Sequence, residues 1–370
     1  MHHRLLPLDR LRGLVIVLMT VDHASGAFNR GRLVRDAAAM VKPGEVLDPA
    51  QFLLRWITHL CAPTFLFLAG AALALSVARR QARGVSAGAI DRDLAIRGLL
   101  ILALDPLWVS RFWAGDAILL QVLYGIGATF LLLVPLRRLP PAGALAVGLT
   151  LVVGGEALAG GVLALSGGKP ALPGALLVHG GFFDGLIVAY PALPWLAVAL
   201  LGWWWGHRLD RTGAPPDRTA RELALAGLAS LAVFGVVRGL DGYGNLLLYR
   251  GGTDLVSWLH VSKYPPSVTY VTLELGLMAL LLAAFFALEP RRQPADPRAP
   301  LLIWGQTALF FYVLHIPLLE LVSHATGLHR AGGIGLTLAA AALTLAALTL
   351  PCVAYRAYKA AHPTSWARFL

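Results

Sequence analysis

Long runs of apolar residues alternate with short clusters of charged and turn-forming residues along the whole chain. Each run is about as long as the roughly 20 residues that an α-helix needs to cross a bilayer. Such runs form helices, because backbone N–H and C=O groups in lipid have no partner except one another. The pattern predicts an all-α, polytopic transmembrane bundle of about ten spans. We expect these spans at 11–29, 52–78, 94–113, 117–136, 142–165, 186–206, 222–240, 267–288, 301–322 and 334–355.

Helix breakers separate the predicted spans, as in the segment 289–300, which contains four prolines. Neither a sequence repeat nor a matched pair of interrupted helices is visible, although many transporters contain inverted repeats. We therefore expect one domain over residues 1–370. The tryptophan run 203–205, near the inner end of the sixth span, is interpreted as an aromatic belt at the membrane interface.

The composition supports a membrane protein. Charged residues make up 14% of the chain, against about 25% in an average soluble domain. The formal net charge of +11 does not indicate a nucleic-acid partner, because most arginines lie near helix ends. With both termini in the cytoplasm, 20 of the 31 Lys and Arg residues lie at the inner side. The first outer loop is the exception: it contains Arg30, Arg32, Arg35 and Lys42, offset by Asp36, Glu45 and Asp48.

The first apolar run has a basic flank like that of a signal peptide. Asp22 and His23 interrupt this run, and no small-residue cleavage site follows, so we interpret it as a retained first helix. Cys61 and Cys352 lie inside apolar segments, and no metal site is expected. The Ala-, Leu-, Gly- and Arg-rich usage favours a bacterial cytoplasmic (inner) membrane. A homodimer remains open.

Several ionisable residues fall inside the predicted spans. Each such residue costs about 2.5–3.5 kcal/mol on insertion scales, so each is a hypothesis for a functional site. The predicted topology brings them to one depth, in the outer half of the bilayer, and we expect a shared polar pocket there. These residues are Asp22, His23, Arg55, His59, Glu274, His315 and Glu320, with Lys263 and Tyr264 just outside the eighth span.

Arg12 precedes His23 by eleven residues, about three helical turns, so both side chains project from one face of the first helix. Their separation along the axis is about 16 Å, which places Arg12 at the cytoplasmic surface and His23 past the middle of the membrane. An acyl-coenzyme A, whose long arm joins phosphates to a thioester, has the shape that this spacing requires.

Five segments, in order along nearly the whole chain, resemble the bacterial members of the heparan-α-glucosaminide N-acetyltransferase catalytic-domain family. The spacing from Arg12 to His23 also resembles a signature of membrane acyltransferase family three. The resemblance implies transfer of an acyl group, acetyl in the favoured case, from cytoplasmic coenzyme A to an extracytoplasmic hydroxyl or amine, with a sugar or glycoconjugate as acceptor. The segments are 8–23, 55–76, 190–209, 262–276 and 304–321.

On this hypothesis acyl-CoA is a co-substrate, and no cofactor is permanently bound. His23 acts as general base and is oriented by Asp22, with His59 beside them; a covalent acyl-histidine is a variant. The donor's phosphates are expected at Arg12, Arg79, Arg80 and Arg97. The acceptor and the oxyanion are expected at Lys263, Tyr264, Tyr312 and His315.

Each of these residues also has a structural interpretation. Arg12 is typical of a snorkelling anchor at a helix end, and His59 near Pro63 is typical of a helix kink. A transporter or flippase for a sugar or lipid-linked intermediate would place its binding site in the same polar cluster. A non-catalytic membrane scaffold would need none of these side chains, so replacing His23 and His59 together distinguishes that alternative.

Overall fold

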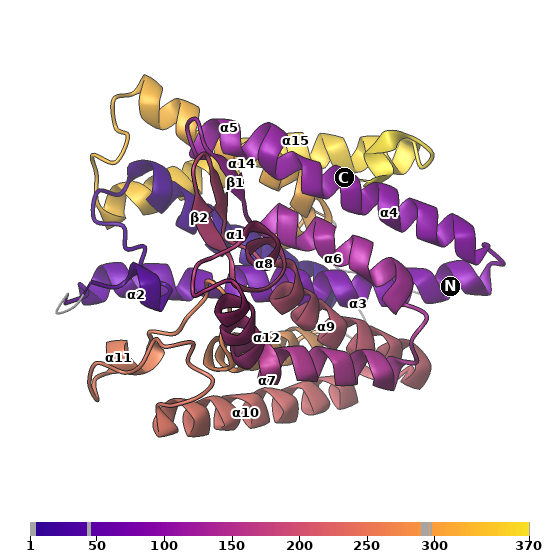
Figure 1. Ribbon diagram of the computed structural model, residues 1–370. Helices are drawn as coiled ribbons and strands as arrows, with labels where there is room; N and C mark the ends of the chain where they lie inside the picture. The colour runs from indigo at the N-terminus through magenta and orange to yellow at the C-terminus, as the bar shows by residue number, and fades with distance from the viewer. Residues whose placement is uncertain (1–4, 43–45, 290–295, 297, 370) are drawn as a thin grey trace.

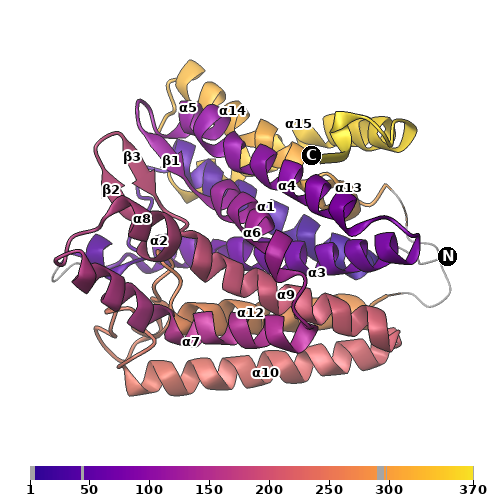
Figure 2. The same ribbon diagram turned by 45° about the vertical axis from the view of Figure 1, so that its right-hand side comes forward.

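The computed structural model describes residues 5–42, 46–289, 296 and 298–369. Helices make up 74% of the chain and strands very little (Figure 1). The prediction of an all-α membrane bundle is confirmed. The start of the first helix and the end of the last long helix lie at the same end of the bundle, at the right of Figures 1 and 2.

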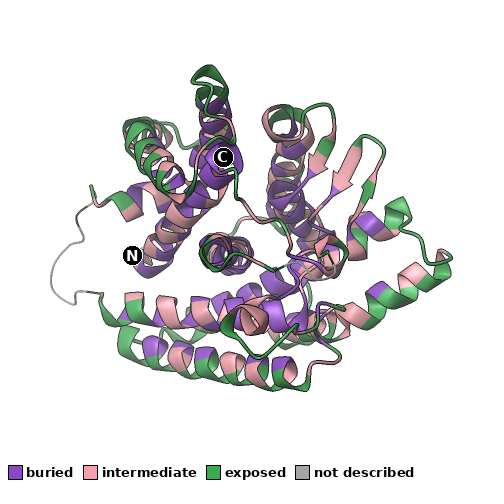
Figure 3. Cartoon of the chain, turned by 90° about the vertical axis from the view of Figure 1, so that its left-hand side faces the viewer, coloured by how far each residue is buried: buried purple, intermediate pink, exposed green. Residues whose placement is uncertain are grey.

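Within the described residues, seven helical segments are long and apolar enough to cross a membrane. In an apolar 18-residue stretch of each segment, 67% of the residues are buried in α1 and 72% in the segment Pro49–Ala82. The corresponding shares are 11% in α7 and 22% in α10. The first two segments are therefore interior, and α7 and α10 lie on the outside, as the burial colours in Figure 3 also show. The seven segments are α1 (Leu6–Phe28), α2 with α3 (Pro49–Ile57 and Cys61–Ala82), α7 (Pro141–Leu165), α10 (Pro216–Leu240), α12 (Val268–Ala287), α14 (Ala308–Ala325) and α15 (Ile334–Ala361).

The other three predicted spans are also helical. They correspond to α4 (Ala87–Leu104), α6 (Val122–Leu136) and α9 (Ala192–Thr212). Charged side chains are frequent in α4, α6 is only 15 residues long, and α9 contains the tryptophan run. Trp203 is 1% exposed and Trp205 is 9% exposed, so the interpretation of this run as an interface belt is wrong for both residues. They pack in the core because α9 crosses the interior of the bundle.

Small residues allow the interior helices to approach closely. A Cβ atom on Gly70 of α3 would lie 2.0 Å from the Ala199 carbonyl oxygen of α9, and one on Gly202 would lie equally close to the carbonyl oxygen of Phe67. Glycine at the crossing lets the two backbones touch, which is how helices commonly associate in membranes. Gly305 of α13 (Pro300–Gln306) makes a similar approach to α1.

Two of the predicted spans are interrupted. A 3₁₀ turn at Thr58–Leu60 separates α2 from α3, and Thr307 separates α13 from α14. Pro63 has no N–H to donate to the carbonyl oxygen of His59, four residues earlier. That oxygen accepts a hydrogen bond from the Tyr270 hydroxyl at 2.9 Å. Neither break is evident from the apolar pattern of the sequence, although the neighbouring Pro63 is consistent with a kink at His59.

A small sheet lies where two spans were expected to begin. Its strands are β1 (Ile118–Leu120), β2 (Gly181–Phe183) and β3 (Leu186–Val188), in the order β1-β3-β2. β1 and β3 are parallel, with Ile118 opposite Leu186, and β2 is antiparallel to β3. Asp105, in the π-helical turn η3 (Asp105–Val109) between α4 and α5 (Ser110–Trp113), accepts hydrogen bonds from the Gln121 and Tyr124 amides at 2.8 and 2.6 Å. These bonds fix the start of α6 beside the sheet.

Candidate active site

Two cavities lie along α1. The outer one has a volume of about 780 Å³ and is lined by Asp22 and His23, and the inner one, of about 290 Å³, is lined by Arg12. Phe65, Val122 and Tyr312 line both cavities. These side chains therefore form a thin partition between the two cavities, which is called the partition below.

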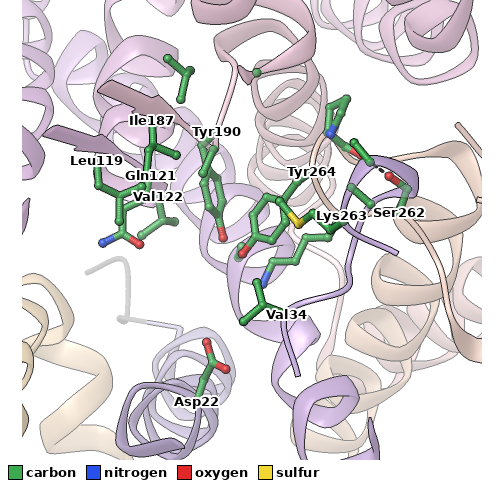
Figure 4. Close-up of a pocket in the computed structure, with 18 of the residues that line it drawn as sticks. Asp22, Val34, Leu119, Gln121, Val122, Ile187, Tyr190, Ser262, Lys263 and Tyr264 are labelled. Carbon is green, nitrogen blue, oxygen red and sulfur yellow. Dashed lines mark hydrogen bonds between the residues drawn. The ribbon is translucent and has the colours of Figure 1, made fainter. Parts of the chain in front are cut away.

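Outer-loop residues and helix ends together form the wall of the outer cavity. In Figure 4, Asp22 on α1 faces Tyr190, Lys263 and Tyr264 across the space, while Gln121 and Val122 line another side. Lys263 is 3% exposed, and its ammonium group lies over the ring of Tyr264, 5.3 Å from the centroid. Among the described residues, the cavity wall contains five cationic side chains and a single carboxylate, that of Asp22. The cations are Arg30, Arg32, Arg55, Lys263 and Arg330.

His23 and His315 form a hydrogen-bonded pair at the edge of this cavity. The Nδ1 atom of His23 lies 2.6 Å from Nε2 of His315, and Nδ1 of His315 lies 2.7 Å from the carbonyl oxygen of Tyr312. A carbonyl oxygen only accepts, so Nδ1 of His315 carries a proton and the neutral ring accepts at Nε2. His23 then donates from Nδ1, which leaves its Nε2 atom unprotonated. This tautomer makes His23 a base whose orientation the second histidine fixes.

Neighbouring side chains hold the pair in place. The ring of Trp113 on α5 meets His23 edge-on at 4.5 Å between centroids. Pro317 leaves the carbonyl oxygen of Val313 without its helical donor, and the indole Nε1 of Trp108 donates to that oxygen at 2.9 Å. The segment α14 is thereby tied to η3 beside His315.

Arg55, in the cavity wall, joins two carboxylates. Its Nη1 atom donates to Asp22 at 2.6 Å, and its Nε atom donates to Asp36 at 2.9 Å. Asp36 also lies 3.2 Å from Nε2 of His59, and Arg32 pairs with Asp22 at 3.2 Å. Since a buried charge is tolerated only when it is paired and hydrogen-bonded, the five side chains form one interdependent network.

Asp36 connects this network to the loop that carries Lys263. Its backbone carbonyl oxygen accepts a hydrogen bond from the backbone amide of Lys263 at 2.7 Å. Burial by itself would raise the pKa of the Asp36 carboxyl group, but Arg55 and His59 hold that pKa well below its ordinary value. Burial would likewise raise the pKa of the Tyr264 hydroxyl, and the charges of Lys263 and Arg55 lower it. The loop between α1 and α2 is therefore anchored by a fully ionised carboxylate.

The inner cavity is cationic. Arg12, Arg97 and Lys359 line it, together with the backbone around Thr307 where α13 and α14 are separated. Arg12 donates to Asp9 at 2.9 Å and to the carbonyl oxygen of Gly305 at 3.3 Å. Arg97 forms no ion pair within the described part of the chain, and its guanidinium group lies over the ring of Phe130 at 5.6 Å. Arg97 is therefore available to an anionic ligand.

The structure brings most of the predicted site residues to these two cavities. Asp22, His23, Lys263, Tyr264 and Tyr312 line the outer one. His59 and His315 line neither cavity and lie behind Asp36 and His23. At the inner cavity the prediction places four arginines, of which Arg12 and Arg97 line the wall. Arg80 instead pairs with Asp93 at 2.7 Å, and Arg79 is exposed outside the cavity wall.

Sequence reasoning missed several side chains of the site. Arg32 and Asp36 belong to the first outer loop, where they were treated only as charges that weaken the orientation rule. The excess of arginine in that loop was the one available signal, because Arg32 is retained there to pair with Asp22. Neither Trp113, at the end of a predicted span, nor Tyr190, before a proline, is marked by charge in the sequence. Only the packing of the helices brings these two side chains to the cavity.

The family model for the catalytic region of heparan-alpha-glucosaminide N-acetyltransferase matches residues 4–237. The chain belongs to this family. The resemblance noted from the sequence is thus confirmed, and the protein is a multi-pass membrane transferase of the heparan-alpha-glucosaminide N-acetyltransferase type. The match ends in α10, so Lys263, Tyr264 and the His315 half of the histidine pair lie beyond it. No curated protein matches the sequence.

The Asp36→Asn variant tests the network. Removing one member of a buried ion pair typically costs about 3–5 kcal/mol, so we expect a lower thermal unfolding midpoint in detergent at pH 7. Because its folded-state pKa is depressed, Asp36 stabilises the fold above its unfolded pKa of about 3.9, and this contribution is lost as the pH falls below that value.

The variant should therefore also flatten the loss of stability between about pH 5 and pH 3. The exposed Asp184 provides the control, and Asp184→Asn should leave both the midpoint and its pH dependence unchanged. An Asp36→Asn protein that unfolds with the wild-type midpoint and pH dependence would contradict the network.

Proposed function

We propose that the protein transfers an acyl group, acetyl in the favoured case, from cytoplasmic acyl-CoA to a hydroxyl or amine acceptor at the outer side of the membrane. The observation that carries the proposal is the pair of cavities that share the partition of Phe65, Val122 and Tyr312. A donor on one side and an acceptor on the other can meet at this partition without either crossing the bilayer. Family membership supports the acetyl group and a glucosaminide-like acceptor.

The inner cavity suits the donor. Arg97 and Arg12 supply guanidinium groups, which recognise phosphates through several fixed donors, and Lys359 adds a third charge. The cavity of about 290 Å³ accommodates the narrow pantetheine arm, while the nucleotide end remains at the cytoplasmic mouth. The thioester then lies against the partition, where Tyr312 presents a buried hydroxyl with no hydrogen-bond partner among the described residues. That hydroxyl can donate to the carbonyl oxygen as negative charge develops there.

His23 supplies the base. The oxygen or nitrogen atom of the acceptor attacks the thioester carbonyl carbon while Nε2 of His23 removes the proton from that atom. His315 accepts the hydrogen bond from Nδ1 of the resulting imidazolium. Collapse of the tetrahedral intermediate breaks the C–S bond, and the proton passes from His23 to the departing thiolate. A positioned base of this kind contributes about 10²–10⁴-fold to the rate.

The outer cavity suits an acceptor with anionic substituents. Asp22 and Asp36 pair with Arg32 and Arg55, and the remaining cations Arg30, Lys263 and Arg330 leave a positive surface. The ammonium group of Lys263 has no ion-pair partner within the described residues. A positive cavity of this kind attracts negatively charged ligands and raises their local concentration. A sugar or glycoconjugate that bears carboxylate, sulfate or phosphate groups fits this surface.

The orientation completes the proposal. The N-terminal end of α1 and the C-terminal end of α15 lie at the same end of the bundle. Arg12 near the start of α1 and Lys359 near the end of α15 line the inner cavity. We infer that this end faces the cytoplasm of a bacterial cell and that the membrane is the cytoplasmic one, as the distribution of Lys and Arg predicts.

The His23→Ala variant tests the catalytic step. We expect a fall of at least about 100-fold in the transfer of radiolabel from acetyl-CoA to a sugar or to water, because the general base is lost. Replacement of the exposed His362 by alanine is the matched control and should leave transfer unchanged. Full transfer by a folded His23→Ala protein would exclude the role. Uptake of sugar into vesicles without transfer of label would favour a transporter instead.

The Arg97→Ala variant tests the donor site. One charge-assisted hydrogen bond is worth about 1.5–3 kcal/mol, so the KM for acetyl-CoA should rise about 10- to 100-fold while kcat changes little. Arg79→Ala removes the same charge outside the cavity and should leave KM unchanged. Equal effects of the two variants on KM would show that the inner cavity does not bind the donor.

A further inference from the structure

Three potential metal ligands converge at the outer end of α14. Glu320 lies on that helix, His324 follows one turn later, and His329 lies in the loop before α15. The Oε2 atom of Glu320 is 3.6 Å from Nδ1 of His329 and 3.9 Å from Nε2 of His324. One ligand atom from each residue lies within 4.8 Å of the other two.

The charges of Arg330 and Arg32 offset that of Glu320 in part, but neither arginine forms an ion pair with it among the described residues. Glu320 is 7% exposed, and no hydrogen bond reaches its carboxylate from the described residues. Both imidazoles lie beyond the 2.7–3.2 Å of an ordinary hydrogen bond. A buried carboxylate needs a cation or several hydrogen bonds to offset the loss of water. A cation between the carboxylate and the two rings would contact all three side chains.

The spacing fits a tetrahedral ion. Zinc binds imidazole nitrogen at about 2.0–2.1 Å and carboxylate oxygen at about 2.0–2.2 Å, so ligand atoms around it are about 3.4 Å apart. The separations of 3.6 and 3.9 Å from the Glu320 oxygen exceed this value by about 0.2 and 0.5 Å. The side chain of His324 is 64% exposed, and its ring stacks on that of His329 with 4.1 Å between centroids, so binding an ion would require the exposed ring to turn out of this stack.

The loop that supplies His329 is already held in place. The Arg330 amide donates to the carbonyl oxygen of Ala27 at 2.8 Å, and the Gly332 amide donates to that of Phe28 at 2.9 Å. Ser323 Oγ also lies 3.2 Å from Nδ1 of His329, a contact that a bound ion would replace. An ion would therefore meet ligands whose backbones are fixed by the end of α1, which lowers the ordering cost of binding.

We propose that Glu320, His324 and His329 bind one Zn²⁺ ion, or a divalent transition metal of similar preference, with the fourth position open to solvent. Two imidazoles and one carboxylate are a donor set that suits zinc. This site was not predicted from the sequence, where no metal site was expected. The proposal does not depend on the proposed acyl transfer.

The ion would connect the outer ends of two helices that carry the histidine pair. Glu320 lies five residues after His315, about 7.5 Å along α14. His329 is in the loop that is hydrogen-bonded to the end of α1. One of the acceptors there is Phe28, five residues after His23. Occupancy would therefore restrain α14 against α1 at a position close to the His23–His315 contact.

Zinc titration of the purified full-length chain tests the proposal. The protein is prepared without an affinity tag and with His2 and His3 replaced by alanine, since the N-terminal histidine pair would bind zinc itself. We expect one Zn²⁺ per chain by calorimetry or by competition with a chromophoric chelator, and a higher thermal unfolding midpoint with zinc, because the folded state alone binds it.

Two substitutions and one control make the assignment specific. Glu320→Gln, which preserves shape, and His324→Ala, at an exposed position, should each weaken zinc binding by more than about 10-fold and remove the zinc-dependent rise in midpoint. His362→Ala removes an exposed histidine elsewhere and should change neither. Absence of stoichiometric binding, or binding that survives both substitutions, would overturn the proposal.

Discussion

The guanidinium group of Arg55 lies buried between the carboxylates of Asp22 and Asp36, and the outer half of the molecule is organised around these contacts. One carboxylate belongs to α1 and the other to the following loop, so a single side chain from α2 fixes both. Through the carbonyl oxygen of Asp36 the same network reaches the backbone of Lys263, more than two hundred residues later. Charges that lipid would otherwise exclude are tolerated here because each has a partner in the interior.

The interior helices position this network beside the two cavities. Glycine contacts bring α3 against α9 and α13 against α1, so the helices that line the cavities are held close together. The partition of Phe65, Val122 and Tyr312 then separates a cationic inner cavity from an outer one that contains the His23 imidazole. The breaks at Thr58–Leu60 and Thr307 turn backbone toward these regions, where irregular structure is tolerated because protein rather than lipid surrounds it.

Much of the fold follows from the sequence, because the length of an apolar run and the position of prolines act locally. All ten predicted spans are helical, although three of them fall short of the length or hydropathy of a membrane span. The helical repeat also placed Arg12 and His23 correctly on one side of α1, one at each cavity. The interior tryptophans of α9 were misassigned because a local pattern does not tell which helix lies at the centre.

Several residues of the candidate site were predictable from the sequence, but their contacts with one another were not. Ionisable residues in apolar runs identified His23, Asp22, Arg55 and His315, since their cost of insertion is visible in the sequence. The pairing of His23 with His315, and the contact of Asp36 with Arg55, depend on residues far apart in the chain. Arg79 and Arg80 were predicted from their charge alone, and the structure directs them away from the inner cavity.

The claim that the two cavities meet at one partition is tested most directly by a sided reaction. Purified protein is reconstituted into liposomes with a glucosamine-containing oligosaccharide trapped inside, and radiolabelled acetyl-CoA is added only outside. The account predicts that label accumulates on the trapped sugar while coenzyme A stays outside, in the fraction of protein molecules whose inner cavity faces outward. Label that reaches the sugar only when donor and acceptor share one compartment would contradict it.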